Sequence, residues 1–399
     1  MKPKCLDLDC GFFFPILMKK VFYFGLLGLG LFEFLKVYLI MPFPGSQVWN
    51  TIDFAYFLHE WRIFFRIVFG LMVLIGLLTT GKSLPRWTSI GLVAATLGLI
   101  YLFNFRMAAD VMFEEPKELS FLNRDSFDEN DSTLVVAIEN GGEAKAYPIR
   151  YIVYHHQVRD TLSGAPMMVT YCSVCRTGRV FSPMVDGKPE RFRLVGMDHF
   201  NAMFEDSETG SWWQQATGHA ITGELKGKKL DEIESIQLTA GAFFKAYPDG
   251  KIMAADPNFL SKYDSLGKFE KGKSESELTG TDPFSWNEKS WVVGLELNGQ
   301  SKAYDWNQLK KEKSIRDRVG EKELILLMSK DSQSFVALQL PEKAGSHRWT
   351  GDSLYLDSAA YLFTGKSLDP SLPDLVRVKA YQEFWHSWRT FRPETEKHN

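Results

Sequence analysis

The stretch VVAIENGGEAKAY at Val135–Tyr147 returns as VVGLELNGQSKAY at Val292–Tyr304, and this pair decides the fold of most of the chain. Seven of the thirteen positions are identical at an offset of 157 residues. Two further pairs of segments keep this offset: Arg159-Asp160 with Arg316-Asp317, and Met167–Tyr171 with Leu324–Met328. Self-similarity at a fixed offset indicates a duplicated structural unit.

Within each copy the local pattern is mostly that of strands. Short β-branched or aromatic runs are bounded by Gly, Pro and Asp, as in STLVVAIE, AKAYPI, MMVTYC, GRVFSP and RFRLVG. Short helices are expected at Arg150–Val158 and in the aromatic stretches Ala240–Pro248 and Gln382–Pro393, which close the two copies. The sequence therefore predicts an α+β body of two related β-rich repeats, packed as a pseudo-dimer.

Three apolar runs precede this body, at Val21–Ile40, Ile63–Thr79 and Thr88–Phe105. About 20 helical residues at a rise of about 1.5 Å cross the hydrocarbon core of a bilayer. Buried helices of a soluble domain rarely follow one another as three such runs, so we expect a three-helix membrane anchor. A cleaved signal peptide is disfavoured, because the first run has no small-residue cleavage pattern and two more runs follow it.

Basic residues predict the orientation of this anchor. Those before the first run are Lys2, Lys4, Lys19 and Lys20, and those between the second and third runs are Lys82 and Arg86. The connection between the first and second runs carries only Arg62. Because cytoplasmic segments are enriched in Lys and Arg, we expect the N-terminus inside and the body on the extracytoplasmic side.

The composition of the whole chain limits the class of protein and its partners. The whole chain has 46 Lys and Arg against 49 Asp and Glu, with 45% hydrophobic residues, which excludes a disordered chain. Basic residues are scattered rather than clustered with aromatic ones, so we expect no nucleic acid as a partner. The three apolar runs lead us to expect membrane lipid as a partner. The predicted parts are a tail (1–20), three transmembrane helices (21–108), a linker (109–131), the first repeat (132–256), a second linker (257–289) and the second repeat (290–393).

The Cys-x-x-Cys motif formed by Cys172 and Cys175 is the sharpest chemical signal. Attachment of c-type haem requires a histidine at position 176, which is Arg176. A thioredoxin-like site requires the motif at a helix N-terminus, whereas Thr177–Phe181 predicts a turn and a strand. Thiol redox chemistry, a metal site and an inert thiol pair or disulfide stay open.

A metal site, for zinc or copper, would need two more ligands. We expect His155 or His156 as the third ligand, because they precede the strand that ends at the motif. His199 or Asp206 would be the fourth. No catalytic residue is predicted.

The repeat offset bears on these alternatives. It places Cys172 on Ser329 and Cys175 on Ser332, so the second copy lacks both thiols. If the cysteines served only the fold, both copies would need them. The first copy is therefore the candidate working half, and the second is a scaffold or lid.

A dense polar and aromatic stretch runs from Gly196 to Gly223. Its candidate ligand-binding residues are Asn201, Trp212 and Trp213, which we expect in a pocket wall with a stacking platform. For the two tryptophans taken alone, however, a place in the core of a turn-rich segment is the favoured interpretation.

These residues resemble a known bacterial family, domain of unknown function 3179. The resemblance rests on Tyr171–Cys175, on a segment Asp-x-x-Thr-Gly-Ser-x-Trp that begins at Asp206, and on Gly223–Leu230. It implies a protein of the bacterial envelope, here of the inner (cytoplasmic) membrane, and no activity. We therefore expect a membrane-anchored extracytoplasmic protein whose first repeat carries a Cys/His metal site or a thiol-redox site. The alternative is a membrane-anchored binding or assembly module with structural cysteines.

Overall fold

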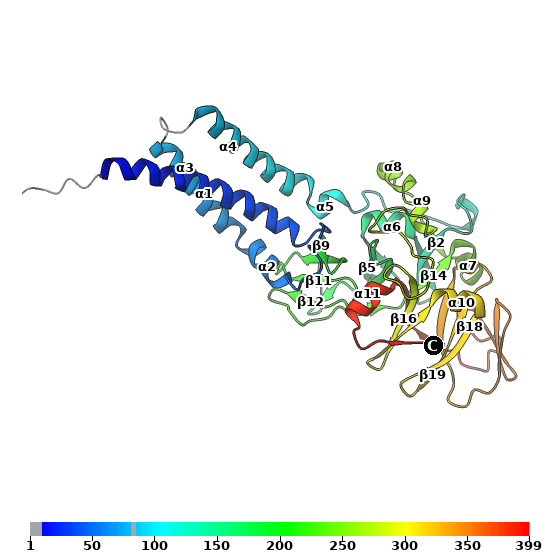
Figure 1. Ribbon diagram of the computed structural model, residues 1–399. Helices are drawn as coiled ribbons and strands as arrows, with labels where there is room; N and C mark the ends of the chain where they lie inside the picture. The colour runs from blue at the N-terminus through cyan, green and yellow to red at the C-terminus, as the bar shows by residue number, and fades with distance from the viewer. Residues whose placement is uncertain (1–9, 81–84, 399) are drawn as a thin grey trace, which may run out of the picture. The chain divides into compact units, whose positions relative to one another are not determined.

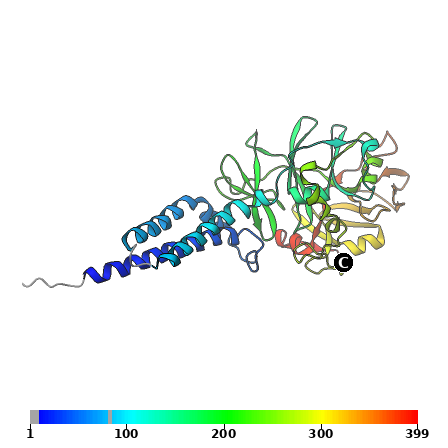
Figure 2. The same ribbon diagram turned by 90° about the horizontal axis from the view of Figure 1, so that it is seen from above.

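The computed structural model describes residues 10–80 and 85–398, which divide into two compact units. The first unit comprises the chain up to Met112 together with Val195–Asp198, and the second comprises Phe113–Leu194 and 199–399. The first is almost entirely helical and the second is rich in strands (Figures 1 and 2). The protein is thus α+β, with an N-terminal helical region and a β-rich body, as the sequence predicts.

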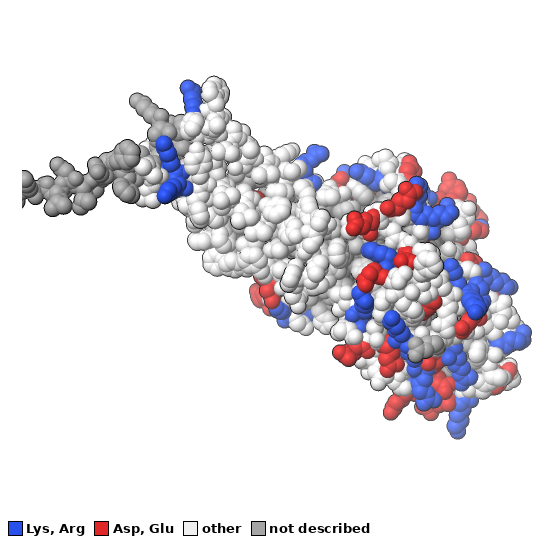
Figure 3. Space-filling view, in the orientation of Figure 1, with Lys and Arg blue, Asp and Glu red and all other residues white. Residues whose placement is uncertain are grey.

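The helical unit contains three helices that are long and apolar enough to cross a membrane, at Ile16–Tyr38, Arg62–Thr79 and Arg86–Arg106. Charged side chains are sparse on its visible surface and dense over the body (Figure 3). Its elements are α1 (Cys10–Tyr38), α2 (Ile52–Glu60), α3 (Arg62–Thr80), α4 (Arg86–Tyr101), the π-helical turn η1 (Leu102–Arg106) and α5 (Ala109–Met112).

Two features of this unit differ from the sequence expectation. Helix α1 begins at Cys10, inside the stretch expected to be a tail, and α2 occupies the connection between the first two runs. Lys2, Lys4 and Lys82, which enter the predicted orientation, lie outside the described residues.

A buried polar cluster joins three elements of the helical unit. Glu33 on α1 is fully buried, and its carboxylate lies 2.5 Å from Arg66 Nε on α3 and 3.1 Å from Lys36 Nζ. Asn104 on η1 donates to the same carboxylate at 2.9 Å. Ionised groups this deep among apolar helices are stable only when paired, which the cluster achieves.

The body begins with a five-stranded sheet in the order β1-β15-β3-β2-β14. A four-stranded sheet β13-β6-β5-β4 and another, β12-β11-β10-β9, follow from the same part of the chain. The strands of these sheets are β1 (Phe121–Leu122), β2 (Leu134–Asn140), β3 (Glu143–Pro148), β4 (Gln157–Leu162), β5 (Ala165–Cys172), β6 (Thr177–Phe181), β9 (Phe192–Asp198), β10 (Asn201–Asp206), β11 (Trp212–Gln214), β12 (Ala220–Thr222), β13 (Glu232–Ile233), β14 (Ile236–Thr239) and β15 (Lys251–Met253).

The later part of the body has sheets β25-β16-β17-β26, β18-β19-β20-β24 and β21-β22-β23. Their strands are β16 (Trp291–Leu297), β17 (Gln300–Asp305), β18 (Ser314–Val319), β19 (Lys322–Met328), β20 (Phe335–Gln339), β21 (His347–Trp349), β22 (Ser353–Leu356), β23 (Ala359–Leu362), β24 (Arg377–Val378), β25 (Ala380–Phe384) and β26 (Glu396–Lys397). We use "first half" for residues 113–253 and "second half" for residues 291–398.

Short helices complete each half of the body. In the first half they are the 3-10 turn η2 (Arg124–Ser126), α6 (Ile149–His155) and α7 (Ala240–Ala246), and in the second they are α10 (Trp306–Glu312) and α11 (Trp385–Phe391). The remaining small elements are the two-stranded ribbon β7 (Met184–Val185) with β8 (Lys188–Pro189), η3 (Pro257–Phe259), α8 (Leu260–Asp264) and α9 (Gly267–Glu270).

The two halves have corresponding contacts. The hairpin β2–β3 leads into α6, and the hairpin β16–β17 leads into α10. Tyr147 donates to Asp160 at 2.6 Å, and Tyr304 donates to Asp317 at 2.9 Å, both pairs at the 157-residue offset. The last strand of each half then runs parallel to its partner, β15 with β3 and β26 with β17.

The segment expected to be a polar linker, 257–289, partly belongs to the core of the first half. Its Phe259, Tyr263 and Phe269 are buried in one apolar cluster with residues of β2, α6 and β5. The sequence did not indicate this burial, because the three aromatic residues stand among many charged and polar ones.

Candidate functional site

The Cys-x-x-Cys motif forms the tight turn between β5 and β6. Arg176 closes the turn with a left-handed backbone (φ 55°), and both of its terminal nitrogens donate at 2.8 Å to the carbonyls of Phe269 and Glu270. Its guanidinium also lies 3.9 Å from the ring centre of Trp291, a cation–π contact. The residue that excludes haem attachment therefore fixes the geometry of the turn.

Both sulfurs face one backbone carbonyl. Cys172 and Cys175 are free, fully buried thiols, and their Sγ atoms lie 3.5 Å and 3.3 Å from the carbonyl oxygen of Phe200. The backbone N–H of Cys175 donates to the Cys172 sulfur at 3.3 Å. The turn thus holds the two sulfurs on the same side.

The carbonyl of Phe200 reaches the sulfurs through a strained hairpin. His199 and Phe200 form the two-residue connection between β9 and β10, with φ values of 48° and 66°. Such a turn favours Asn-Gly, because other residues are strained at positive φ. Strain of this kind is frequent where a backbone group must be placed for function.

A buried amide network continues from the thiols. Asn201 donates to the Cys175 sulfur at 3.2 Å and to Gln215 Oε1 at 2.9 Å. Gln215 in turn donates to Thr170 and to the carbonyl of Thr177. The cysteines therefore do not lie in an apolar core but in polar, hydrogen-bonded surroundings.

The second half, together with Lys289 just before it, supplies the opposite wall of the site. The backbone N–H of Phe384 donates to the Cys175 carbonyl at 2.9 Å. Lys289 Nζ and His386 Nε2 lie 3.3 Å and 3.2 Å from the carbonyl oxygen of Val174, between the two cysteines. Burial, above all, lowers the pKa of His386 to about 4, so its ring is neutral at pH 7.

The environment separates the two thiols electrostatically. Burial acts to raise the pKa of Cys172, but hydrogen bonds from the Cys175 thiol and from the backbone N–H groups of Ala202 and Cys175 bring this pKa below its ordinary value. Burial raises the pKa of Cys175 well above its ordinary value, and its contact with Cys172 adds to the effect. Cys172 is thus the more readily ionised thiol.

The predicted histidine ligands have other partners. His155 is hydrogen-bonded to the backbone carbonyl of Glu114 and to the hydroxyl of Tyr263. His156 is buried and stacks on Phe113 at 4.5 Å between ring centres, and burial lowers the pKa of His156 to about 4. Within residues 10–80 and 85–398, no three His, Cys, Asp or Glu side chains come together as metal ligands. The predicted metal set of Cys172, Cys175, His155, His156, His199 and Asp206 is therefore not assembled.

Of the three ligand-binding residues predicted in the polar and aromatic stretch, one lies in the site. Asn201 contacts Cys175, whereas Trp212 and Trp213 are buried and donate their indole N–H groups to Glu205 and Asp206 at 2.9 Å and 2.8 Å. Asp206 also accepts from the backbone of Thr209 at 2.7 Å. The two tryptophans fill the core, which is the interpretation that the sequence favours for them alone.

Sequence reasoning did not find the residues that the second half brings to the thiols. Glu383 and Ser387 lie on β25 and α11, close enough to Cys175 to influence its pKa. A second offset between the two halves of the body, different from 157 residues, could have indicated these residues. The strand and helix pairs β14–α7 and β25–α11 correspond at 145 residues, which aligns Glu383 with Leu238 and Ser387 with Ala242.

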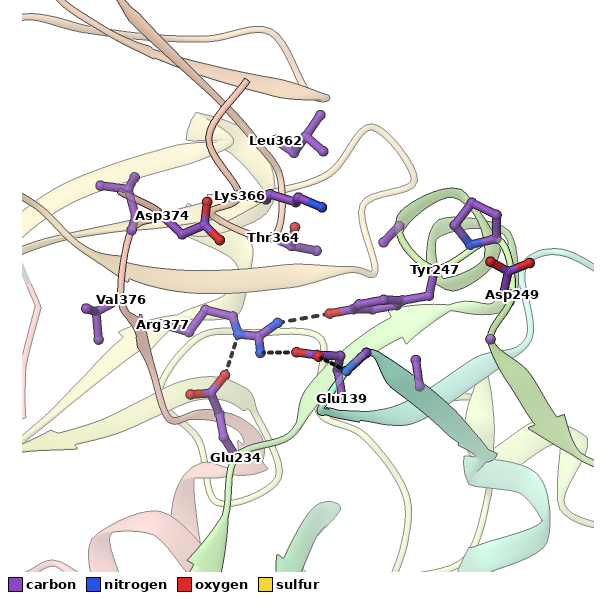
Figure 4. A pocket seen from close by; sticks show the side chains of 16 residues that line it. Glu139, Glu234, Tyr247, Asp249, Leu362, Thr364, Lys366, Asp374, Val376 and Arg377 are labelled. Carbon is purple, nitrogen blue, oxygen red and sulfur yellow. Dashed lines mark hydrogen bonds and ion pairs between the residues drawn. The ribbon is translucent and has the colours of Figure 1, made fainter. Parts of the chain in front are cut away.

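A separate cavity of about 560 Å³ lies elsewhere in the body, lined by residues of both halves (Figure 4). Arg377 projects into it and is held by Tyr247 at 2.9 Å, by Glu139 at 3.6 Å and by Glu234. The positive charge of Arg377 is thus neutralised by carboxylates that also line the cavity. The cysteines are not among the lining residues.

The chain was compared with protein families, curated proteins and solved structures. The sequence profile of the family described as "Protein of unknown function (DUF3179)" matches residues 117–395, more than half of the chain. No curated protein and no solved structure matches it. The matched range covers both halves of the body, including the Cys-x-x-Cys turn and the residues that face it from the second half. The chain therefore belongs to the DUF3179 family.

Proposed function

We propose that Cys172 and Cys175 are a thiol–disulfide redox couple, carried by a membrane-anchored extracytoplasmic body. One observation carries the proposal: the two sulfurs share the Phe200 carbonyl, and the pKa of one thiol is lowered while that of the other is raised. This division of roles is what a nucleophilic thiol and a resolving thiol require.

The proposed reaction takes its oxidant from the class of disulfides, RSSR. The Cys172 thiolate attacks one sulfur, so that a Cys172–S–S–R bond forms and RS⁻ leaves. Cys175 then loses its proton, attacks the Cys172 sulfur and expels the second RS⁻. The two thiols give up two electrons and two protons, and the oxidant becomes two RSH.

Three further properties belong to the same proposal. The three apolar helices are transmembrane spans of the bacterial inner membrane, with the N-terminus inside. The body is two copies of one unit, which is supported by the 157-residue offset and by the matched pairs Tyr147–Asp160 and Tyr304–Asp317. The second copy has lost the cysteines and completes the site of the first.

The test uses the full chain in detergent micelles, equilibrated in glutathione buffers of increasing oxidation. Alkylation and mass spectrometry then count free thiols. We expect Cys172 and Cys175 to be lost together as one intramolecular disulfide and to return on reduction. In the matched variant Cys175→Ser, we expect a mixed disulfide with glutathione at Cys172 instead.

Two outcomes would contradict the redox proposal. Thiols that stay reduced in every buffer and react only after unfolding would identify the cysteines as structural, in a binding or assembly module. One equivalent of zinc or copper that is lost in Cys172→Ser would identify a metal site instead.

A further inference from the structure

The amide of Asn201 contacts the sulfur of the resolving thiol directly. Asn201 is fully buried at the start of β10, and its Nδ2 donates to the Cys175 Sγ at 3.2 Å. The preceding residue, Phe200, directs its carbonyl oxygen to the same sulfur at 3.3 Å. The hairpin between β9 and β10 therefore brings one acceptor and one donor to Cys175 from adjacent residues.

A backbone group fixes which end of this amide faces the sulfur. The backbone N–H of Ala216 donates to Asn201 Oδ1 at 2.8 Å. A reversed amide would place its NH₂ group against this N–H, so that two donors would face each other. The orientation of Asn201 is thus set by a group that cannot accept a hydrogen bond.

The neighbouring amide of Gln215 is fixed in the same way. Its Nε2 donates to the Thr177 carbonyl at 3.2 Å and to the Thr170 hydroxyl at 3.1 Å. The Thr170 hydroxyl gives its own hydrogen to the carbonyl of Arg179 at 2.9 Å. Gln215 Oε1 therefore faces Asn201 Nδ2, at 2.9 Å. One hydrogen of Asn201 Nδ2 goes to Gln215, and the other is left for the sulfur.

The second half indicates that the repeated fold accommodates this turn without the amide. The repeat offset aligns Cys175 with Ser332, whose hydroxyl accepts from Lys313 Nζ at 2.6 Å. Lys313 aligns with His156 and not with Asn201. The amide network therefore accompanies the cysteines rather than the repeated unit.

The donor and the acceptor at the Cys175 sulfur suit different protonation states. A thiol can donate to the Phe200 carbonyl, whereas a thiolate has no hydrogen to give and is stabilised by an N–H that points at it. Burial, above all, raises the pKa of Cys175 well above its ordinary value. The Asn201 N–H is held where it offsets this cost when Cys175 becomes a nucleophile.

We propose that Asn201 is a catalytic residue, which stabilises the Cys175 thiolate when this thiolate attacks the mixed disulfide at Cys172. The inference rests on the proposed redox couple. The RS⁻ released in the first step takes the proton of Cys175 and becomes RSH. The Cys175 thiolate, hydrogen-bonded to Asn201, then forms the S–S bond with Cys172 while the Cys172–S–S–R bond breaks and the second RS⁻ leaves.

Charged and titratable groups near Cys175 enter the pH dependence of its reaction. They come from the turn and from each element that faces it: Cys172 and Arg176 on the turn, Tyr171 on β5, Glu383 on β25, His386 on α11 and Lys289 before β16. These groups are the same in the wild type and in a variant of Asn201. The ratio of the two rates at each pH therefore isolates the contribution of Asn201.

The experiment uses the full chain in micelles with Cys5→Ser and Cys10→Ser, so that Cys172 and Cys175 are the thiols that remain. An aromatic disulfide whose thiolate is coloured releases one equivalent when Cys172 attacks and a second when Cys175 attacks. In Asn201→Leu, which has a similar volume and no side-chain N–H, we expect the first step to be unchanged and the second to be slowed by about sixfold.

This magnitude follows from two opposing effects on the Cys175 thiolate. Loss of a hydrogen bond to a charged sulfur lowers the population of the thiolate about 30-fold, a ratio that corresponds to about 2 kcal/mol. The remaining thiolate has a higher pKa and is more nucleophilic, with a Brønsted coefficient of about 0.45. The net slowing is therefore about sixfold.

A second variant gives a signature that loss of structural support would not give. Asn201→Asp keeps an oxygen for the Ala216 N–H and replaces the donor by a carboxyl oxygen. A protonated carboxyl group can donate to sulfur, whereas a carboxylate repels a thiolate. The second-step rate relative to the wild type should therefore fall as the pH rises through the ionisation of this carboxyl group.

Gln157 supplies the matched control for removal of a buried amide. It is fully buried on β4, and its Nε2 donates to Glu115 at 3.1 Å and to the carbonyl of Phe192 at 2.9 Å. Gln157→Leu should leave the second step within about twofold of the wild type, a ratio that corresponds to about 0.4 kcal/mol. The first step reports correct folding in each variant, and Asn201→Ala replaces Asn201→Leu if the latter does not fold.

The outcomes separate this inference from the redox proposal. If the wild type releases only one coloured thiolate, the redox couple itself is refuted. If the wild type releases two, and Asn201→Leu and Asn201→Asp release the second at the wild-type rate at every pH, only the role of Asn201 is refuted. Equal slowing of both steps in Asn201→Leu, or equal slowing of the second step in Gln157→Leu, would assign Asn201 to structural support and would likewise overturn the inference.

Discussion

Cys172 and Cys175 differ in their surroundings although they are three residues apart. Cys172 receives hydrogen bonds from the Cys175 thiol and from two backbone N–H groups, whereas burial and the neighbouring Cys172 sulfur raise the pKa of Cys175. Donors stabilise a thiolate, whereas a neighbouring negative charge opposes one. The turn therefore makes two identical side chains chemically unequal.

This inequality predicts the effect of removing one thiol. In Cys175→Ala, the pKa of Cys172 should rise, because a donor to its sulfur is lost. The pH dependence of alkylation by iodoacetamide, followed by mass spectrometry, measures that pKa, since the thiolate is the reactive form. Cys175→Ser keeps a donor and should show the smaller rise. An unchanged pH midpoint in both variants would contradict the proposed roles of the thiols.

Single residues could be predicted only where the chemistry is local in sequence. Cys172, Cys175 and Asn201 stand out in short polar motifs, and the structure brings these three together. His155 was an equally reasonable ligand by spacing. Its ring instead pairs with Tyr263, a residue of a segment that the sequence presents as a polar linker.

At the scale of elements, periodicity was a sound guide. The predicted runs STLVVAIE, MMVTYC and GRVFSP overlap β2, β5 and β6, and the two aromatic stretches contain α7 and α11. The walls of the site could not be predicted in this way. Glu383 and Ser387 lie near the cysteines because Phe384, at the junction of β25 and α11, donates its backbone N–H to the Cys175 carbonyl, a contact that no local pattern encodes.

The helical elements of the first unit depend on their polar cluster. In Glu33→Gln, we expect the free energy of unfolding to fall by about 3 kcal/mol, because Arg66 and Lys36 lose their counter-charge in a buried place. Thermal unfolding in detergent, followed by circular dichroism, measures the loss. Glu60→Gln on α2, where the side chain is exposed, is the control and should change stability little. Equal stability of both variants would show that the cluster does not hold the helices.

At the scale of the whole molecule, the distribution of basic residues predicts the topology. A reporter that is active only outside the cytoplasm should be active when fused after Asn399. The same reporter fused after Lys82 should be inactive, because the connection between the second and third spans is expected inside. The reverse pattern would place the body in the cytoplasm.

The contact between the Val174 carbonyl and His386 closes a loop of 212 residues, and this has a consequence for folding. Contacts between distant residues form late, because a long segment must first be ordered to bring them together. Until then, the nascent chain presents Cys172 and Cys175 without their cover. In an oxidising compartment, the first redox state of the two thiols therefore depends on which process is faster, oxidation of the thiols or docking of the second half.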